Sequence, residues 1–400
     1  MLEMVNRFCV VIGSSADSGE IDAERRSDWS GNRFLGPCAR GFRTIVINLD
    51  AENIMPSTKL ANSEAKIVKL KDVALRAGCS LATASRALNG NPTVGEVERE
   101  RVLAAAAQLG YVPNNSARAL RAQTKHLVGV IIPTLDHAIY AKMVDGLQDR
   151  LAQAGTSVII NTSGYDLERE RSQARLLVAR GVEAIILVGA EHQTQTVETL
   201  ARAGVSQILT YTDTPGDASG AVGFDNYASG ISAAKYLLEL GHRRFGMIAG
   251  LTQHNDRARL RRDGYLDAIM EAGISRDNVV VLEAPYSIDA GGAAMRSLMQ
   301  THPRPTAVFC GSDILAVGAV KYCGPAGISV PKDVSIIGFD NLEIAHVVEP
   351  ELTTIDVPAR EMGQMAAEAL IEFKKSGEKG IVKTLQTRLL IRQSTGPAPD

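Results

Sequence analysis

From Leu127 onward, short runs rich in valine and isoleucine alternate with stretches long enough to form helices. Runs that are apolar along their whole length predict strands buried on both faces, and the intervening helices predict a parallel sheet covered on both sides. The runs form two series, from LVGVIIP to AVGFD and from RFGMIAGL to VSIIGFD. We therefore expect two doubly wound α/β subdomains, with a ligand bound at the carboxyl ends of the strands in the cleft between them.

The segment before this body has a different pattern, DVALRAGCSLATASRALNG, at residues 72–90. A first helix ends at Gly78, and Ser80 is placed to cap a second helix, LATASRAL. A third helix, EVERERVLAAAAQLG, follows. Two helices joined by a short turn predict a helix-turn-helix that places its second helix in the DNA major groove, although a plain αα-hairpin has the same spacing. The residues expected to form its small core are Val73, Ala74, Ala77, Ala84, Leu88, Val102 and Leu109.

The stretch GYVPNNSARALRAQTK comes next. Asn114 can cap a short helix that carries Arg118, Leu120 and Arg121. Such a helix can contact DNA or can simply link two domains, and the spacing alone leaves both interpretations open.

Charge is distributed unevenly along the chain. The formal net charge is -2, yet residues 66–125 contain ten Lys or Arg and four Asp or Glu. A compact basic segment on an acidic body predicts a polyanionic partner at that end only.

The five cysteines are odd in number, widely spaced and without a CxxC pair, which indicates free thiols in a reducing compartment. No apolar run reaches the roughly 18 residues of a membrane span, and the first residues make a poor signal peptide. We therefore expect a cytoplasmic protein with no membrane partner. Residues 1–65 show no sustained period. They are either a disordered arm or the result of a start site set too early, with the true start at Met55.

Enzyme motifs are missing from the sequence. There is no GxGxxG after the first strand, no Walker A lysine and no GxSxG turn, and the histidines lack metal-ligand spacing. We expect neither catalysis nor a metal or cofactor. A transport-class binding protein shares the cleft, but it needs an export signal and has no helix-turn-helix.

The stretches VKLKDVALRAGCSLATASRALNGNPTV, GYVPNNSARALR and LVGVIIP together resemble the start of the LacI/GalR (lactose-repressor) family of bacterial transcription regulators. The likeness continues through GHRRFGMIAG, RARLRRDGY, GSDILAVGA, VSIIGFDN and PELTTIDVPAREMG to LLIRQST, over roughly residues 67–396. The resemblance implies a small all-α helix-turn-helix domain and a periplasmic-binding-protein-like core. It also implies a repressor that binds a palindromic double-stranded DNA operator as a homodimer and responds to a small-molecule effector, a sugar or sugar derivative.

The expected domain limits follow from this resemblance. We expect the chain to cross between the subdomains near residues 226–242, 352–358 and 378–384. No leucine heptad follows LLIRQST, which favours a dimer over a coiled-coil tetramer. The expected parts are an extension (1–65), a helix-turn-helix domain (66–113), a hinge helix (114–124), an N-terminal effector subdomain (125–240 and 358–378) and a C-terminal effector subdomain (241–357 and 379–395).

In the DNA-binding part, the resemblance places Leu81, Ala82 and Arg86 at base-reading positions. An arginine can contact guanine through two hydrogen bonds, whereas leucine and alanine offer apolar contact or simply fill the surface. In the hinge helix, which begins at Asn114, Leu120 matches a leucine wedged between base pairs, and Arg118 and Arg121 suit the narrow minor groove. The positions that match phosphate contacts are Ser80, Thr83, Ser85 and Asn89, of which Ser80 can equally be a helix cap.

In the cleft, the strongest candidate is Arg261, because a guanidinium can fork onto hydroxyls, a carboxylate or a phosphate. Asp313 can accept hydrogen bonds from a sugar or cap a helix, Tyr286 can stack on a ring or pack at the cleft edge, and Asp136 can instead serve a turn. His137 and Ala138 replace an Asn-Pro of many relatives, so the chain departs from the family pattern in that loop. The matching effector positions are Asp136, Ile139, Tyr140, Asp225, Arg261, Tyr286 and Asp313.

Overall fold

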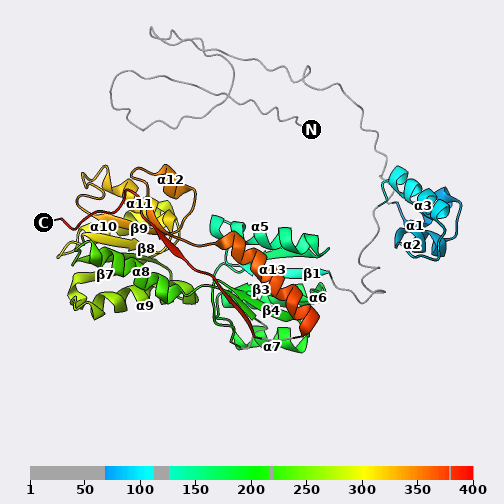
Figure 1. Ribbon diagram of the computed structural model, residues 1–400, viewed down its shortest axis with the longest axis horizontal. Helices are drawn as coiled ribbons and strands as arrows, with labels where there is room; N and C mark the ends of the chain where they lie inside the picture. Colours follow the sequence, from blue (N-terminus) through cyan, green and yellow to red (C-terminus); the bar gives the residue numbers. More distant parts are fainter. Residues whose placement is uncertain (1–67, 112–125, 217–219, 378–379, 400) are drawn as a thin grey trace, which may run out of the picture. The chain divides into compact units, whose positions relative to one another are not determined.

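The computed structural model describes residues 68–111, 126–216, 220–377 and 380–399, which form two compact units (Figure 1). Residues 68–111 make the first unit and the remaining described residues make the second. The predicted extension and the predicted hinge residues Asn114, Arg118, Leu120 and Arg121 lie outside the described residues.

The first unit contains three helices, α1 (Leu70–Ala77), α2 (Leu81–Leu88) and α3 (Glu96–Leu109), each of which packs on the other two. Helix α1 ends at Gly78, whose φ of 64° lies in the left-handed region that favours glycine. Small side chains allow the helices to approach closely. Leu88 and Leu109, which we expected in the core, are only partly buried. The buried core is Val73, Ala74, Ala77, Ala84, Ala87, Val94, Val102, Ala105 and Ala106.

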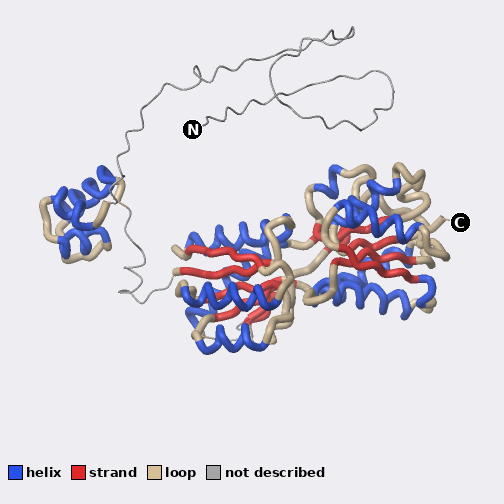
Figure 2. Tube along the Cα trace, turned by 180° about the vertical axis from the view of Figure 1, so that it is seen from behind, coloured by secondary structure: helices blue, strands red, loops and turns tan. Residues whose placement is uncertain are grey.

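The second unit has two lobes, each built on a six-stranded sheet with helices on both faces (Figure 2). All neighbouring strands pair in parallel except β10 and β12. The predicted class, two doubly wound parallel-sheet subdomains, is confirmed. In sheet order, the first lobe has β11 (Ile381–Thr384), β5 (Gly220–Gly223), β4 (Ser206–Thr210), β3 (Ala184–Val188), β1 (Leu127–Ile132) and β2 (Ser157–Thr162). The second lobe has β12 (Arg388–Leu390), β10 (Thr353–Asp356), β9 (Ser335–Asp340), β8 (Ala307–Cys310), β6 (Phe245–Gly250) and β7 (Val279–Ala284).

Paired helices cover each sheet. In the first lobe, α5 (Ala138–Gln153) and α13 (Ala359–Ser376) pack together on one face, and α6 (Leu167–Ala179) and α7 (Thr194–Arg202) pack on the other. In the second lobe, α8 (Asn226–Glu239) and α9 (Asp256–Glu271) face α10 (Ile288–Met299) and α11 (Asp313–Cys323) across the sheet. Two shorter helices, η2 (Arg276–Asn278) and α12 (Ile344–Val347), complete this lobe. Central strands such as β3 and β8 are buried on both faces, and these strands therefore read as continuous apolar runs.

Three of these helix pairs cross with a glycine on each helix. A Cβ on Gly363 would overlap the carbonyl oxygen of Met143, and a Cβ on Gly264 would overlap that of Tyr227. Close backbone approach is therefore possible only without a side chain at these positions. The glycine pairs are Gly146 with Gly363 (α5 and α13), Gly230 with Gly264 (α8 and α9) and Gly291 with Gly318 (α10 and α11).

Gly363→Ala is expected to lower the free energy of unfolding by about 1–3 kcal/mol, because the added methyl group forces α13 away from α5. Alanine in a helix interior is otherwise favoured over glycine. Gly324→Ala is the control, since a Cβ there meets no atom within 4 Å. Urea denaturation followed by circular dichroism gives the values. A Gly363→Ala protein as stable as the parent would contradict the close crossing.

The chain passes between the lobes three times, at Gly223–Asn226, Asp356–Ala359 and Thr384–Arg388. The structure corrects two of the predicted limits. Helix α8, predicted for the N-terminal subdomain, packs on α9 in the second lobe, and β11, predicted for the C-terminal subdomain, pairs with β5 in the first sheet. The order of apolar runs gives no sign of which lobe an element packs against.

Candidate functional site

Helix α2 presents one exposed face. Residues 81, 82, 85, 86 and 89 recur at the spacing of a single helical face, whereas Ala84 and Ala87 are buried against α1 and α3. Leu81 is 54% exposed. Arg86 is exposed, and its Nε donates a hydrogen bond to the carbonyl oxygen of Ala82 at 3.3 Å. The structure thus places the three predicted base-reading residues together on the surface.

The amino terminus of α2 is capped by Ser80. Its Oγ accepts a hydrogen bond from the backbone N–H of Thr83 at 3.0 Å and lies 2.9 Å from the Thr83 hydroxyl. The helix-cap interpretation of Ser80 therefore holds, and a cap does not prevent the same hydroxyl from meeting a phosphate. Helix amino termini also favour anions. Ser85 is partly buried and Asn89 ends the helix.

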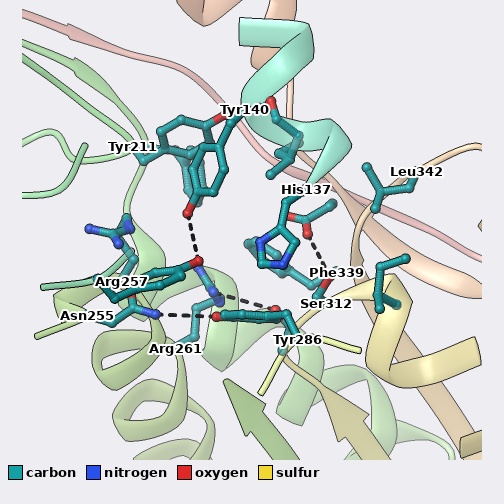
Figure 3. Close-up of a pocket in the computed structure, with 16 residues that line it drawn as sticks. His137, Tyr140, Tyr211, Asn255, Arg257, Arg261, Tyr286, Ser312, Phe339 and Leu342 are labelled. Atoms are coloured by element: carbon teal, nitrogen blue, oxygen red, sulfur yellow. Dashed lines mark hydrogen bonds between the residues drawn. The ribbon is translucent and has the colours of Figure 1, made fainter. Parts of the chain in front are cut away.

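A small pocket, a cavity of about 40 Å³ with an open mouth, lies between the two lobes (Figure 3). Most of its wall comes from the carboxyl ends of strands, where this architecture is expected to bind ligands. The first lobe contributes His137, Ile139, Tyr140, Tyr165, Tyr211 and Phe224. The second contributes Asn255, Arg257, Arg261, Tyr286, Gly311, Ser312, Ile314, Phe339, Asp340 and Leu342.

Four of the seven predicted effector residues, Ile139, Tyr140, Arg261 and Tyr286, line this pocket. The three acidic ones do not. The backbone N–H of Asp136 donates to Thr134 Oγ1 in a turn at 3.0 Å.

Asp225 is exposed and caps α8, accepting the N–H of Ala228 at 2.9 Å. Asp313 is fully buried, where it accepts the Thr354 hydroxyl at 2.6 Å and the N–H of Leu342 at 2.7 Å. Sequence shows which residues follow a strand but not where their side chains turn.

Arg261 lies near the junction of the lobes. Its Nη1 donates to Asn226 Oδ1 at 2.5 Å, and Asn226 Nδ2 donates to the carbonyl oxygen of Tyr211 at 2.9 Å. The guanidinium carbon lies 4.3 Å from the centre of the Phe339 ring, within range of a cation–π interaction.

Asp340 is the acidic residue that the sequence did not single out. It accepts a hydrogen bond from the Ser312 hydroxyl at 3.0 Å. Burial raises the pKa of Asp340 to about 8, although the nearby Arg261 opposes the shift. Its backbone has a φ of 103°, and Tyr165 and Tyr211 also have positive φ values, of 61° and 60°. All three follow or end strands, and such backbone strain is common at binding sites.

Aromatic rings meet across the pocket. His137, from the first lobe, lies edge-on to Tyr286, from the second, with ring centres 5.0 Å apart (Figure 3). The Tyr140 and Tyr165 hydroxyls are 3.3 Å apart. Burial raises the pKa values of Tyr140 and Tyr211 above the usual range and lowers that of His137, so all three side chains are neutral at pH 7.

Polar contacts join the lobes beside the pocket. Asp256 Oδ2 accepts the N–H of Ala190 at 2.9 Å, and Arg257 Nη1 donates to the carbonyl oxygen of Val188 at 3.0 Å. Arg259 pairs with Glu191 at 2.8 Å. The amino terminus of α9 is thereby held against the loop that follows β3, so the structure shows the cleft with its lobes in contact.

No group of His, Cys, Asp or Glu residues in the described part of the chain is arranged to hold a metal ion. Within the same residues, every helix is too short or too polar to cross a membrane.

Two family models match the chain: "Bacterial regulatory proteins, lacI family" at residues 69–114 and "Periplasmic binding protein-like domain" at residues 234–395. Catabolite control protein A of Priestia megaterium is 30% identical over 330 residues, which is 82% of this chain and 99% of the relative. The HTH-type transcriptional repressor CytR of Escherichia coli (strain K12) is 30% identical over 340 residues, 85% of this chain and 99% of the relative.

Solved structures are similar over the same span. The Lac repressor dimer bound to operator and the anti-inducer ONPF has a TM-score of 0.73 and 28% identity, over 83% of this chain and 100% of that one. The transcriptional regulator CelR in complex with cellobiose has a TM-score of 0.61 and 28% identity. The match covers 82% of this chain and 99% of that chain.

Proposed function

The chain belongs to the LacI family of bacterial regulatory proteins, and we propose that it represses transcription in the bacterial cytoplasm as a homodimer on a palindromic operator, under the control of a sugar or sugar-derived effector. Its curated relatives are DNA-binding regulators and not enzymes, and this chain is a regulator of the same kind. The domain limits expected from the sequence, corrected at α8 and β11, form part of this proposal.

The exposed face of α2 supports the proposed DNA contact. Arg86 has the donors to read a guanine edge, and Leu81 and Ala82 have the apolar surface to meet a thymine methyl group. The proposed phosphate contacts, which fix the register of the helix, are Ser80, Thr83, Ser85 and Asn89.

The pocket carries the proposed effector site. Its aromatic walls, among them Tyr140 and Tyr286, suit the face of a sugar ring, while Arg261 offers donors. Ile139 adds apolar contact from the first lobe. That CelR has been solved with cellobiose supports a sugar as the effector class.

The three chain crossings provide a hinge between the lobes. An effector that contacts both lobes favours one closure state over the other, and the change passes to the two hinge helices of the dimer. Coupling of this kind is typically worth about 1–3 kcal/mol.

Two binding experiments test the proposal together. Genomic fragments retained by the purified protein are sequenced, and sugars are screened by thermal shift. We expect retained fragments that share a two-fold symmetric sequence, and a sugar that stabilises the protein and alters retention. A monomer that retains no fragment at low salt contradicts the proposal.

Leu120→Ala is expected to weaken operator binding much more than binding to unrelated DNA, because only the operator complex uses the proposed wedge between base pairs. Leu120 lies outside the described residues, so its role is proposed from the family resemblance. Fluorescence anisotropy on both DNAs gives the two affinities. An equal loss of affinity for the operator and for unrelated DNA would show that Leu120 does not act as a wedge.

A further inference from the structure

His192 is a histidine of the first lobe with an acceptor at each ring nitrogen, and its side chain is only 4% exposed. Nδ1 lies 2.8 Å from a carboxylate oxygen of Glu170 on α6, and Nε2 lies 3.1 Å from the carbonyl oxygen of Gly189. Glu170 is buried as well, and it makes no other ion pair in the described part of the chain. One ring therefore joins α6 to the loop that follows β3.

This arrangement requires two protons on the histidine and the carboxylate together. A neutral imidazole has one N–H and one lone pair, whereas an imidazolium has two N–H donors. Because a carbonyl oxygen only accepts, Nε2 must carry a proton to bond Gly189. A second proton lies between Nδ1 and Glu170, whichever of these two groups holds it more closely. The pair thus holds one proton more than a neutral histidine beside a carboxylate.

Removal of this proton leaves one N–H for two acceptors. The carboxylate of Glu170 is the stronger acceptor, because hydrogen bonds to ionised groups are stronger than those to neutral ones. The remaining N–H therefore stays with Glu170, and a lone pair of Nε2 faces the carbonyl oxygen of Gly189. Two acceptors in contact repel each other. The loop that contains Gly189 (residues 188–192, the junction loop) then loses its contact with the ring.

The junction loop is also the part of the first lobe that meets α9 of the second lobe. The carbonyl oxygen of Val188 accepts a hydrogen bond from Arg257 at 3.0 Å. The N–H of Ala190 donates to Asp256 at 2.9 Å. Gly189 lies between these two contacts, and a Cβ on it would overlap both α9 side chains. The position of the Gly189 peptide therefore sets the geometry of two hydrogen bonds between the lobes.

We propose that His192 and Glu170 form a proton-dependent positioning pair for the lobe junction. With both protons, the pair fixes the junction loop against α9. With one proton lost, the loop loosens and the lobes separate more readily. Closure is thereby linked to proton uptake, so it weakens as pH rises, and with it the affinity for a ligand held by both lobes. The inference goes beyond the proposed function, and its test needs neither DNA nor effector.

Other titrating groups are separated from the pair by comparison between variants. His254 precedes α9 and pairs with Glu191 at 3.5 Å, but its side chain is 43% exposed, and exposed pairs contribute little. Burial raises the pKa of Asp313 to about 7 and that of Asp340 to about 8, and both also titrate in variants of His192. The other charged residues on the elements around the loop are Glu168, Arg169, Arg171 and Arg175 on α6, Glu198 and Arg202 on α7, and Asp256, Arg257 and Arg259 on α9.

Hydrogen exchange followed by mass spectrometry, on full-length protein without ligand, measures the junction loop directly. The N–H of Ala190 exchanges only when its bond to Asp256 opens. Histidine side chains in general change charge between about pH 5 and 8, so exchange is compared at pH 6 and pH 8 after correction for the faster chemical exchange at high pH. Protection of peptides covering residues 188–192 is expected to fall at least fivefold, while peptides from β2 keep theirs. A junction loop equally protected at both pH values overturns the proposal.

His192→Gln removes the titrating ring and keeps a neutral donor with about the reach of Nε2. Protection of the junction loop is expected to change less than twofold between pH 6 and pH 8 in this variant. His254→Gln is the matched control, since it removes the exposed histidine at the same junction, and it is expected to keep at least half of the parental fall. A folded His192→Gln protein with the full parental fall, or a His254→Gln protein with none, contradicts the role of His192.

Glu170→Gln distinguishes a proton-dependent role from a purely structural one. The amide nitrogen of glutamine can donate to Nδ1, which allows a neutral ring to keep Nε2–H on Gly189. This variant is therefore expected to show at pH 8 the protection that the parent shows only at pH 6. Circular dichroism shows whether each variant is folded. A folded Glu170→Gln protein that loses protection at both pH values, or that keeps the parental fall, would show that the pair does not act through its proton.

Discussion

Arg86→Ala is expected to lower the affinity for the operator by about 2–6 kcal/mol, or at least thirtyfold, with far less effect on unrelated DNA. A bidentate contact between arginine and guanine gives about 1–3 kcal/mol of discrimination, and a homodimer makes the contact twice. The structure supports the choice of residue, because Arg86 is exposed on the same face of α2 as Leu81 and Ala82.

Arg101→Ala provides the control for loss of a positive charge in the same unit. Arg101 is exposed on α3 and lies 3.7 Å from Glu98 on the same helix. Fluorescence anisotropy on operator and unrelated DNA, at one salt concentration, compares the two variants. Equal losses on both DNAs for Arg86→Ala would assign this residue to the phosphate backbone instead of a base.

Gly189→Ala is expected to weaken effector binding by about 1.5–3 kcal/mol, or at least tenfold. Gly189 has a φ of 87°, and a Cβ there would overlap Nη1 of Arg257 and Oδ1 of Asp256. The contacts that hold the lobes together, from Arg257 to Val188 and from Ala190 to Asp256, must then open. Each is a hydrogen bond to a charged group, and the quoted range corresponds to losing one of them.

Gly181→Ala separates closure from backbone strain. Gly181 has a φ of 79° in the same lobe, but a Cβ there meets no atom within 4 Å. Both variants are destabilised by an alanine in the left-handed conformation, but only Gly189→Ala disturbs the contacts between the lobes. Calorimetry gives the affinities and small-angle scattering the lobe separation. Equal effector affinity in the two variants would show that these contacts do not control the site.

Much of the fold was predictable because strands buried on both faces leave a direct signature in the sequence. Runs such as LVGVIIP and VSIIGFD predicted β1 and β9, and the alternation with helices predicted the doubly wound class. The lobe assignments of α8 and β11 were not predictable in this way. They depend on packing against α9 and pairing with β5, which are contacts between segments distant in sequence.

The pocket was predicted only in part. Family resemblance supplied Arg261 and Tyr286, which the structure places in the pocket lining, but it also supplied Asp313, which is used internally by Thr354 and Leu342. Tyr211 and Asp340 were missed because the sequence does not show which residues at the ends of strands turn their side chains into the pocket. Residues at the carboxyl end of a predicted strand were the available clue.

Titration of the effector into free protein and into the operator complex tests the central claim most directly, namely that occupancy of the pocket and occupancy of DNA are coupled. We predict affinities that differ by about 5- to 150-fold between the two titrations. By reciprocity, saturating effector must change the affinity for the operator by the same factor. Identical effector affinities with and without operator would contradict the claim.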